Sequence, residues 1–267
     1  MTRRLLIVAV AQGLLALVCA SCTDGKAGSE APLAPVRARG NEIVNEYLKR
    51  DASPFRRSTV SIVVTEPGGP GKRYVFESIR RQQGGETRTL TRAIEPPDER
   101  ELAILTIEVT GQPAVTVTYV ASQKRFRESG TGRTFLGGLT SQELLGEWDK
   151  YESRFVAERA VGGRTMHEVE SVLKKDRDSV IHRIVSLFDA GTGLPRQLEL
   201  FDSRGEKLRT FDMLETRRIG GRDVITKTVV ENHVQRTRIA FDLIDMTFPA
   251  DIPSEVFDRT YLQHLGR

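Results

Sequence analysis

The sequence predicts a mainly β protein with a few short helices, in which a curved antiparallel sheet forms an open half-barrel with helices on its concave face. Three observations support this. From Thr59 onward, runs rich in Val, Ile, Thr, Tyr and Phe alternate between apolar and polar residues, as half-buried strands do. Glycine pairs lie between the runs, where hairpin turns would fall. About ten or eleven such strands would make a sheet that tends to curl.

Length and charge limit the class of protein. The chain has 267 residues, of which 39% are apolar, which is enough for one large β domain or two small domains. The net charge is +4, with both signs interleaved along the chain. Because basic residues do not gather in one block, the charge pattern does not indicate a nucleic-acid partner.

The first residues have the pattern of an export signal. Arg3 and Arg4 precede an apolar run from Leu5 to Val18, which as a helix would be about 21 Å long, shorter than the roughly 30 Å hydrocarbon core. We therefore expect residues 1–21 to be a signal peptide of the lipoprotein type. Ala20-Ser21-Cys22 resembles a bacterial lipobox, with Cys19 where Leu or Val is usual, and predicts lipidation of Cys22. Ordinary cleavage after Ala20, giving a soluble periplasmic protein, is the alternative.

The remaining chain predicts a tether followed by one domain. Residues 22–40 are small, polar and rich in Pro and Gly, as flexible tethers are. Residues 41–267 show no break in composition, and we expect one domain there. It opens with an amphipathic helix in residues 41–50, whose apolar face holds Ile43, Val44, Tyr47 and Leu48.

The strands follow that helix, with two helical interruptions. The expected turns are at Gly68-Gly69, Gly84-Gly85, Gly162-Gly163, Asp189–Gly191, Ser203–Gly205 and Gly220-Gly221. The helical patterns are TSQELLGEWDKY, residues 140–151, and PSEVFDRTYLQHL, residues 253–265, with Pro253 at a helix start.

No motif in the sequence indicates catalysis. The four histidines, His167, His182, His233 and His264, form neither an i, i+4 pair nor an H-E-x-x-H motif, and we expect no metal site. No G-x-S-x-G elbow is present. We therefore expect neither enzyme activity nor a cofactor, and an envelope hydrolase ranks last among the functions considered.

The last third of the chain carries a set of positions typical of a known family, namely Leu194-Pro195, Gly205 to Phe211, Val224 to Val230, Asp251-Ile252-Pro253, Phe257, Tyr261 and Leu262. With these residues it resembles the outer-membrane lipoprotein-sorting protein family (LolA/LolB-like). The resemblance spans residues 41–267 and is strongest at the C-terminal end. In the middle of the chain, Glu143 and Leu144 match an acidic-Leu pair of the family, whereas Gly138 and Leu139 stand where Ser and Asp are usual.

The resemblance implies a half-barrel that binds acyl chains or another lipid-like ligand in the envelope of a Gram-negative bacterium. An apolar groove can shield alkyl chains from water at about 0.8 kcal/mol per buried CH₂. We expect the groove to be lined by apolar strand residues, namely Val60, Ile62, Val64, Tyr74, Phe76, Val117, Tyr119, Phe241 and Leu243. Each of these would otherwise be an ordinary core residue.

Two functions remain open at this point. The first is an envelope lipoprotein that carries lipid or lipoprotein acyl chains between a transporter and a membrane. The alternative is an accessory lipoprotein that docks on a membrane transporter complex, such as an efflux-type one, without its own ligand. Thr23, rather than Asp, follows Cys22, which favours the outer over the inner membrane.

Four basic doublets, Arg56-Arg57, Arg80-Arg81, Lys174-Lys175 and Arg217-Arg218, could meet lipid headgroups or an acidic partner, or be solvated strand ends. The resemblance also implies that an arginine on an early strand could hold a lid shut.

Overall fold

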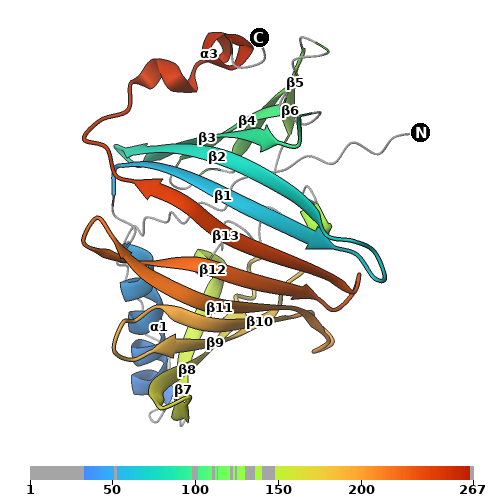
Figure 1. The fold of residues 1–267 in the computed structure, drawn as a ribbon. Coiled ribbons are helices and arrows are strands. Elements are labelled where there is room, and N and C mark those ends of the chain that lie inside the picture. The colour runs from blue at the N-terminus through green and yellow to red at the C-terminus, as the bar shows by residue number, and fades with distance from the viewer. Residues whose placement is uncertain are drawn as a thin grey trace. The chain divides into compact units, whose positions relative to one another are not determined.

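A computed structural model describes residues 33–50, 53–97, 102–109, 112, 114–120, 123, 125–129, 136–139 and 148–264. In this part of the chain, thirteen strands form one antiparallel sheet in the order β6-β5-β4-β3-β2-β1-β13-β12-β11-β10-β9-β8-β7 (Figure 1). Its two end strands do not pair with each other among the described residues, so the sheet is open. The predicted mainly β, open antiparallel fold is confirmed, with thirteen strands instead of ten or eleven.

The elements have the following bounds. The strands are β1 (Phe55–Thr65), β2 (Lys72–Gln83), β3 (Glu86–Glu95), β4 (Leu102–Val109), β5 (Val115–Val120), β6 (Arg125–Ser129), β7 (Tyr151–Val161), β8 (Arg164–Leu173), β9 (Arg183–Asp189), β10 (Pro195–Phe201), β11 (Lys207–Ile219), β12 (Arg222–Asn232) and β13 (Thr237–Thr247). The helices are α1 (Leu33–Lys49), η3 (Leu136–Gly138), η4 (Trp148–Lys150), η5 (Ser254–Phe257) and α3 (Arg259–His264).

Tight turns join successive strands at the predicted glycines. Gly84 and Gly85, between β2 and β3, have φ angles of 62° and 80°. Two successive residues at positive φ make the type I′ turn that matches the twist of a hairpin, and glycine adopts this conformation without steric cost. Because tight turns join consecutive strands, strands that follow each other in the chain are neighbours along most of the sheet.

The contacts within the chain divide it into two compact units. The first holds the described residues within Ala52–Gly146 and Leu214–Arg267, and the second holds those within Leu14–Asp51 and Glu147–Met213. The single domain expected for residues 41–267 stays a prediction.

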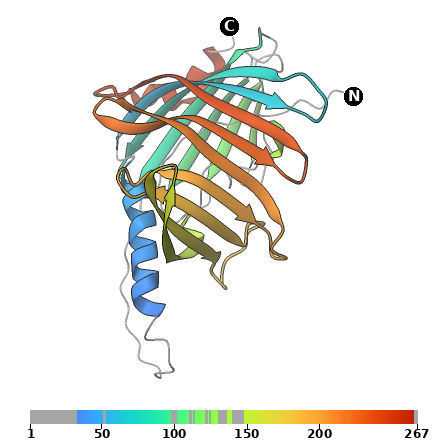
Figure 2. The same ribbon diagram turned by 60° about the horizontal axis from the view of Figure 1, so that its bottom comes forward.

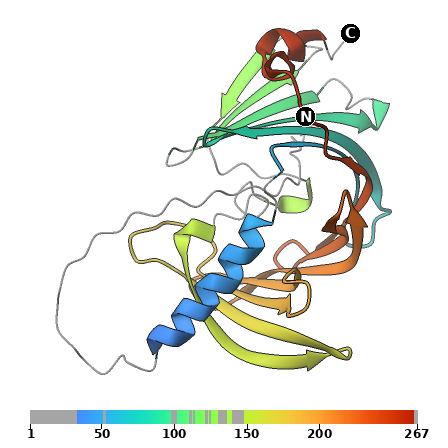
Figure 3. The ribbon, with the colours of Figure 1, turned by 90° about the vertical axis from the view of Figure 1, so that its left-hand side faces the viewer.

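In the first unit, the C-terminal helices cover one face of β2 to β5. Ile252, Val256, Phe257 and Leu262 pack there on a buried cluster that comprises Ile79, Leu90, Ala103, Leu105, Val117 and Tyr119. We call this the α3 face of the sheet; Figure 3 shows α3 beside the green strands of this unit. The short helix η3 packs on the other face, which we call the η3 face.

In the second unit, α1 packs on the strands β7 to β9 (Figure 2). Val44 is buried with Val169 and Phe188, and Ile43, Tyr47 and Leu48 pack around them. The predicted apolar face of this helix is thus confirmed. The helix begins at Leu33, however, so residues 33–40 are helical and not part of a flexible tether. Its first two turns make their own contacts with β7, which composition alone does not reveal.

The two later helical patterns differ from the structure at the positions that it describes. In the pattern over residues 140–151, Trp148–Lys150 forms a 3-10 helix and Tyr151 begins β7, while residues 140–147 lie outside the described residues. The C-terminal pattern forms two short helices, because Asp258 between them has the extended conformation φ −88°, ψ 151°.

Several expectations fall outside the described residues. They are the signal peptide, Cys19, Cys22, residues 22–32 of the tether, and residues 140–147 with the Glu143-Leu144 pair. Within the described part, none of the helices has the length and apolar content needed to cross a membrane.

Candidate functional site

Seven of the nine residues expected to bind a ligand lie side by side on the η3 face. The register pairs Ile62 of β1 with Tyr74 of β2 and Phe241 of β13. One step along the strands, it pairs Val60 with Phe76 and Leu243. Directly opposite residues of an antiparallel pair share a face. These six residues and Val64, on the same face of β1, form a continuous surface that we call the apolar strip.

The side chains of the apolar strip are buried or half-buried. Ile62, Val64, Tyr74, Phe76 and Phe241 are all buried, while Val60 and Leu243 are half-buried. The rings of Tyr74 and Phe76 stack with their centroids 6.3 Å apart. The strip is therefore an apolar surface that the rest of the protein already shields from water.

The short helix η3 forms part of this cover. Gly137 lies so close to the sheet that a Cβ atom on it would be 2.5 Å from Cδ1 of Ile239 and 3.4 Å from Cγ1 of Val64. The carbonyl oxygen of Gly137 accepts hydrogen bonds from Nδ2 of Asn232 and from Oγ1 of Thr237, at 2.9 and 3.0 Å. Two side-chain hydrogen bonds and a glycine contact thus hold η3 on the β12–β13 end of the η3 face.

The same face becomes polar further along β1 and β2. Beyond the Val60–Phe76 pair, the register places Ser58 opposite Ser78, and then Arg56 opposite Arg80. All four side chains are buried. In the doublets Arg56-Arg57 and Arg80-Arg81, the first arginine faces this interior and the second lies on the α3 face. Extending the alternation of Val60 and Ile62 backward would have assigned Arg56 to the strip's face from sequence alone.

Val117 and Tyr119 do not belong to the apolar strip. Both lie on β5 in the buried cluster of the α3 face, under the C-terminal helices. The nine residues therefore do not share one face, because the apolar alternation of β5 points to the opposite face from that of β1. In this structure these two side chains form ordinary core.

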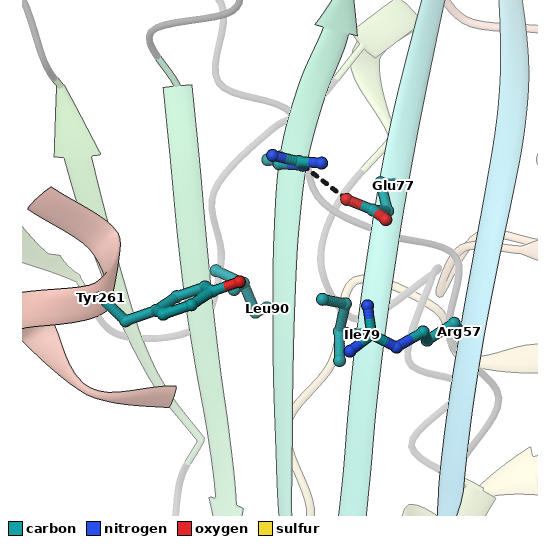
Figure 4. A pocket seen from close by; sticks show the side chains of 6 residues that line it. Arg57, Glu77, Ile79, Leu90 and Tyr261 are labelled. Atoms are coloured by element: carbon teal, nitrogen blue, oxygen red, sulfur yellow. Dashed lines mark hydrogen bonds and ion pairs between the residues drawn. The ribbon is translucent and has the colours of Figure 1, made fainter. Parts of the chain in front are cut away.

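A small pocket lies on the α3 face beside the C-terminal helix (Figure 4). Its lining is Arg57, Glu77, Ile79, Leu90, Arg92 and Tyr261, and its volume is about 50 Å³. Arg92 donates a hydrogen bond to Glu77 across its wall. Pockets for drug-sized ligands measure roughly 300–1,000 Å³, so this one can take water or a small ion but not an acyl chain.

The shifted pKa values belong to turns and surface pairs. Burial raises the pKa of the Asp189 carboxyl, but hydrogen bonds from the backbone of Thr192, the side chain of Arg164 and the backbone of Gly191 outweigh it, so that the pKa lies below its usual value. The hydrogen bond between Lys227 and Glu215, 2.8 Å long, raises the lysine pKa and lowers the glutamate pKa. Lys227 is paired with Asp242, one residue from Phe241 on β13, and therefore lies on the sheet face opposite the apolar strip.

The described residues offer no metal centre. No group of three or more His, Cys, Asp or Glu side chains within them is placed to hold an ion. His167 contacts Glu158, at 3.4 Å, and the ring of Phe155, while Nδ1 of His264 lies 2.7 Å from the carbonyl oxygen of Thr260. Both histidines thus contact residues of their own or a neighbouring element.

A family model described as an uncharacterized protein family matches residues 85–264. The chain belongs to this family. No functionally curated protein matches the sequence at a significant level.

Solved structures resemble the whole fold. A DUF1329 family protein from Desulfovibrio piger has a TM-score of 0.78 at 18% identity, covering 86% of this chain and 99% of the other. A putative outer membrane lipoprotein-sorting protein domain from Vibrio parahaemolyticus has a TM-score of 0.73 at 18% identity, covering 85% and 99%. A LolA superfamily protein from Nitrosomonas europaea has a TM-score of 0.67 at 17% identity, covering 83% and 98%. The resemblance to the lipoprotein-sorting family is therefore confirmed at the level of fold.

Proposed function

We propose that this protein is a non-catalytic carrier of the bacterial envelope that binds lipid or lipoprotein acyl chains on the apolar strip. The observation that carries the proposal is the cross-strand alignment of seven apolar side chains on the η3 face. Two solved structures of the same fold are described as lipoprotein-sorting or LolA superfamily proteins, which supports a carrier-type role.

The physics of the strip suits an alkyl chain. Each buried CH₂ group contributes about 0.8 kcal/mol, so covering eight of them gives a gross gain of about 6 kcal/mol. The strip residues expose no charge, and the two aromatic rings offer broad flat contacts to a chain. An alkyl chain lying across β2, β1 and β13 would take the place of the protein groups that now cover the strip.

Ligand entry requires the cover to move, because Ile62, Tyr74 and Phe76 are buried before any ligand binds. Helix η3 is the element that we propose to move, since it is three residues long and lies against the sheet through Gly137 and the buried Leu136. We propose that its release opens the β13 end of the strip and its return closes it.

The pattern of the N-terminal residues supports a location in the cell envelope. We propose that the signal directs export, that Cys22 carries the lipid anchor, and that the protein faces the periplasm from the outer membrane. Its ligand would arrive from, or pass to, a lipid transporter or a membrane.

One observation favours the alternative, an accessory lipoprotein that docks on a transporter complex. The apolar strip is already buried without a ligand, as it would be if the protein's own side chains permanently filled its interior. The two functions differ in whether the strip ever opens.

Native mass spectrometry of the full chain tests the proposal. The protein is exported in a Gram-negative host, extracted with a nonionic detergent and analysed for acyl-lipid adducts. We expect adducts with the wild type, fewer with Val64→Asn in the strip, and an unchanged amount with Val63→Asn. Val63 is the matched control, because it is the neighbouring valine of β1 on the opposite face. A wild type that carries no acyl lipid and takes none up from vesicles would overturn the carrier function in favour of docking.

A further inference from the structure

The η3 face changes from apolar to cationic in three successive cross-strand rows on β1 and β2. The rows are Val60–Phe76, Ser58–Ser78 and Arg56–Arg80. Residues two apart on a strand share a face and lie roughly 7 Å apart. The two arginines therefore lie roughly 14 Å from the end of the apolar strip, with hydroxyl groups between them and the strip.

Both arginines are held inside the protein. Arg56 and Arg80 are 4% and 1% exposed, and Arg80 is among the largest fully buried side chains of the described residues. Arg80 donates a hydrogen bond from Nη2 to Oε1 of Gln82, which lies on the same face. Each guanidinium group is planar and carries five N–H donors, so that an oxyanion placed against both groups would accept hydrogen bonds from each.

Ser78 supplies an independent observation that points to a ligand. Its side chain is 5% exposed, and its Oγ has no hydrogen-bond partner among the described residues. Buried hydroxyl groups are normally hydrogen-bonded, and each exception calls for an explanation. Ser78 lies between Phe76 and Arg80 on the same face of β2, where the head of a strip-bound chain would be placed.

We infer that Arg56, Arg80 and Ser78 form a subsite for an oxyanion, and that the natural ligand is an anionic amphiphile. Its alkyl chain lies on the apolar strip, and its carboxylate or phosphate accepts hydrogen bonds from the two guanidinium groups and the Ser78 hydroxyl. Arginine suits this task because its planar donors match carboxylate and phosphate geometry. This inference rests on the proposed carrier function and names the class of ligand that the strip selects.

Four decyl compounds separate the headgroup from the chain. The full-length exported protein is mixed with equal concentrations of decanoate, decyl phosphate, decan-1-ol and decyltrimethylammonium, and the adducts are measured by native mass spectrometry. We expect at least one of the two anions to bind about tenfold or more tightly than decan-1-ol, as a charge-assisted hydrogen bond implies. The cation should bind most weakly. Preference for decanoate would identify a carboxylate head and preference for decyl phosphate a phosphate head, and either supports the inference.

The arginine doublet supplies a matched pair of variants. Arg80→Met should remove the preference for anions and leave the affinity for decan-1-ol unchanged. Arg81→Met is the control, because Arg81 bonds Gln83 as Arg80 bonds Gln82, but lies on the opposite face. If Arg80→Met does not fold, Arg80→Lys, which keeps the charge and loses the paired donors, should reduce the preference without abolishing it.

The serine supplies a second test that does not disturb a buried charge. Ser78→Ala should lower the affinity for the anions about tenfold. Thr118→Val should not, although Thr118 is also a buried hydroxyl without a partner among the described residues and lies in the same row three strands away.

The outcomes separate this inference from the function on which it rests. Equal binding of decan-1-ol and both anions, unchanged in the Arg80 and Ser78 variants, would overturn the oxyanion subsite and leave the carrier function intact. If none of the four compounds binds, the carrier function and the subsite are both overturned.

Discussion

Gly137 of η3 lies against Ile239 of β13 so closely that a Cβ atom on the glycine would be 2.5 Å from Cδ1 of the isoleucine. The same glycine has φ +64°, a conformation that L side chains rarely adopt. The cover of the apolar strip therefore depends on the absence of a side chain at one position.

Gly137→Ala should release this cover. We expect the free energy of unfolding to fall by about 2 kcal/mol, since overpacking a core contact costs about 1–3 kcal/mol. We also expect more acyl lipid to co-purify, and faster hydrogen exchange at residues 136–139. Gly84→Ala is the control, because Gly84 has φ +62° with no atom within 4 Å of the added methyl group. If both variants carry the same amount of lipid, η3 is not the element that gates the strip.

Gly40→Ala should destabilise the second unit, although alanine normally favours helices over glycine by about 1 kcal/mol. A Cβ atom at Gly40 would be 2.4 Å from the backbone carbonyl carbon of Arg154 in β7. Next to it, Oδ1 of Asn41 accepts a hydrogen bond from the backbone N–H of Ser153 at 2.9 Å. We expect α1 to be displaced and the unfolding temperature to fall, as measured by circular dichroism. Asn45→Ala, at an exposed position of the same helix, should leave the temperature unchanged or raise it. A stabilised Gly40→Ala variant would show that α1 does not pack against β7 in this way.

Val117→Ala should lower stability without changing ligand binding. Val117 is buried in the cluster under η5 and α3, and loss of its two methyl groups should cost about 2 kcal/mol. The acyl-lipid adducts seen by native mass spectrometry should match those of the wild type. Loss of the adducts in a variant that still folds would show that Val117 of β5 takes part in ligand binding.

Asp189→Asn should weaken the β9–β10 turn in a pH-dependent way. The carboxylate accepts backbone N–H bonds from Gly191 and Thr192 at 3.0 and 2.9 Å, and its folded pKa is depressed below 3.8. A depressed pKa stabilises the folded state above the unfolded pKa, and this stabilisation is lost as the pH falls through the folded pKa. We therefore expect the variant to be about 1–2 kcal/mol less stable at pH 7. The difference should shrink below pH 4, as urea unfolding at several pH values would show. A difference that is constant from pH 7 to pH 3 would contradict this role for the charge.

Sequence patterns predicted much of the strip but not all of it. The alternation around Ile62 assigned Val60, Ile62 and Val64 to one face of a strand, and the same period did so for Tyr74 and Phe76. Nothing local showed that Val117 and Tyr119 point to the opposite face. Strand alternation states which residues share a face, but pairing through β2, β3 and β4 decides which face of the sheet that is.

The helices were less predictable for a related reason. Residues 33–40 have a linker-like composition, yet they are helical because Gly40 and Asn41 dock on β7, and tertiary contacts often override intrinsic propensity. The C-terminal pattern is apolar at helical spacing, yet its chain turns at Asp258 to place both Phe257 and Leu262 on the α3 face.

The sequence by itself determined that the chain is an antiparallel meander, because alternation and glycine turns are local properties and adjacent strands pair through short hairpins. It also determined the apolar character of β1, β2 and β13. Only the tertiary structure decided which alternating sets meet on one face, that η3 covers them, and that Arg56 and Arg80 lie opposite each other beside the strip. Those relationships join residues far apart in the chain, and they depend on the register of the whole sheet rather than on any single segment.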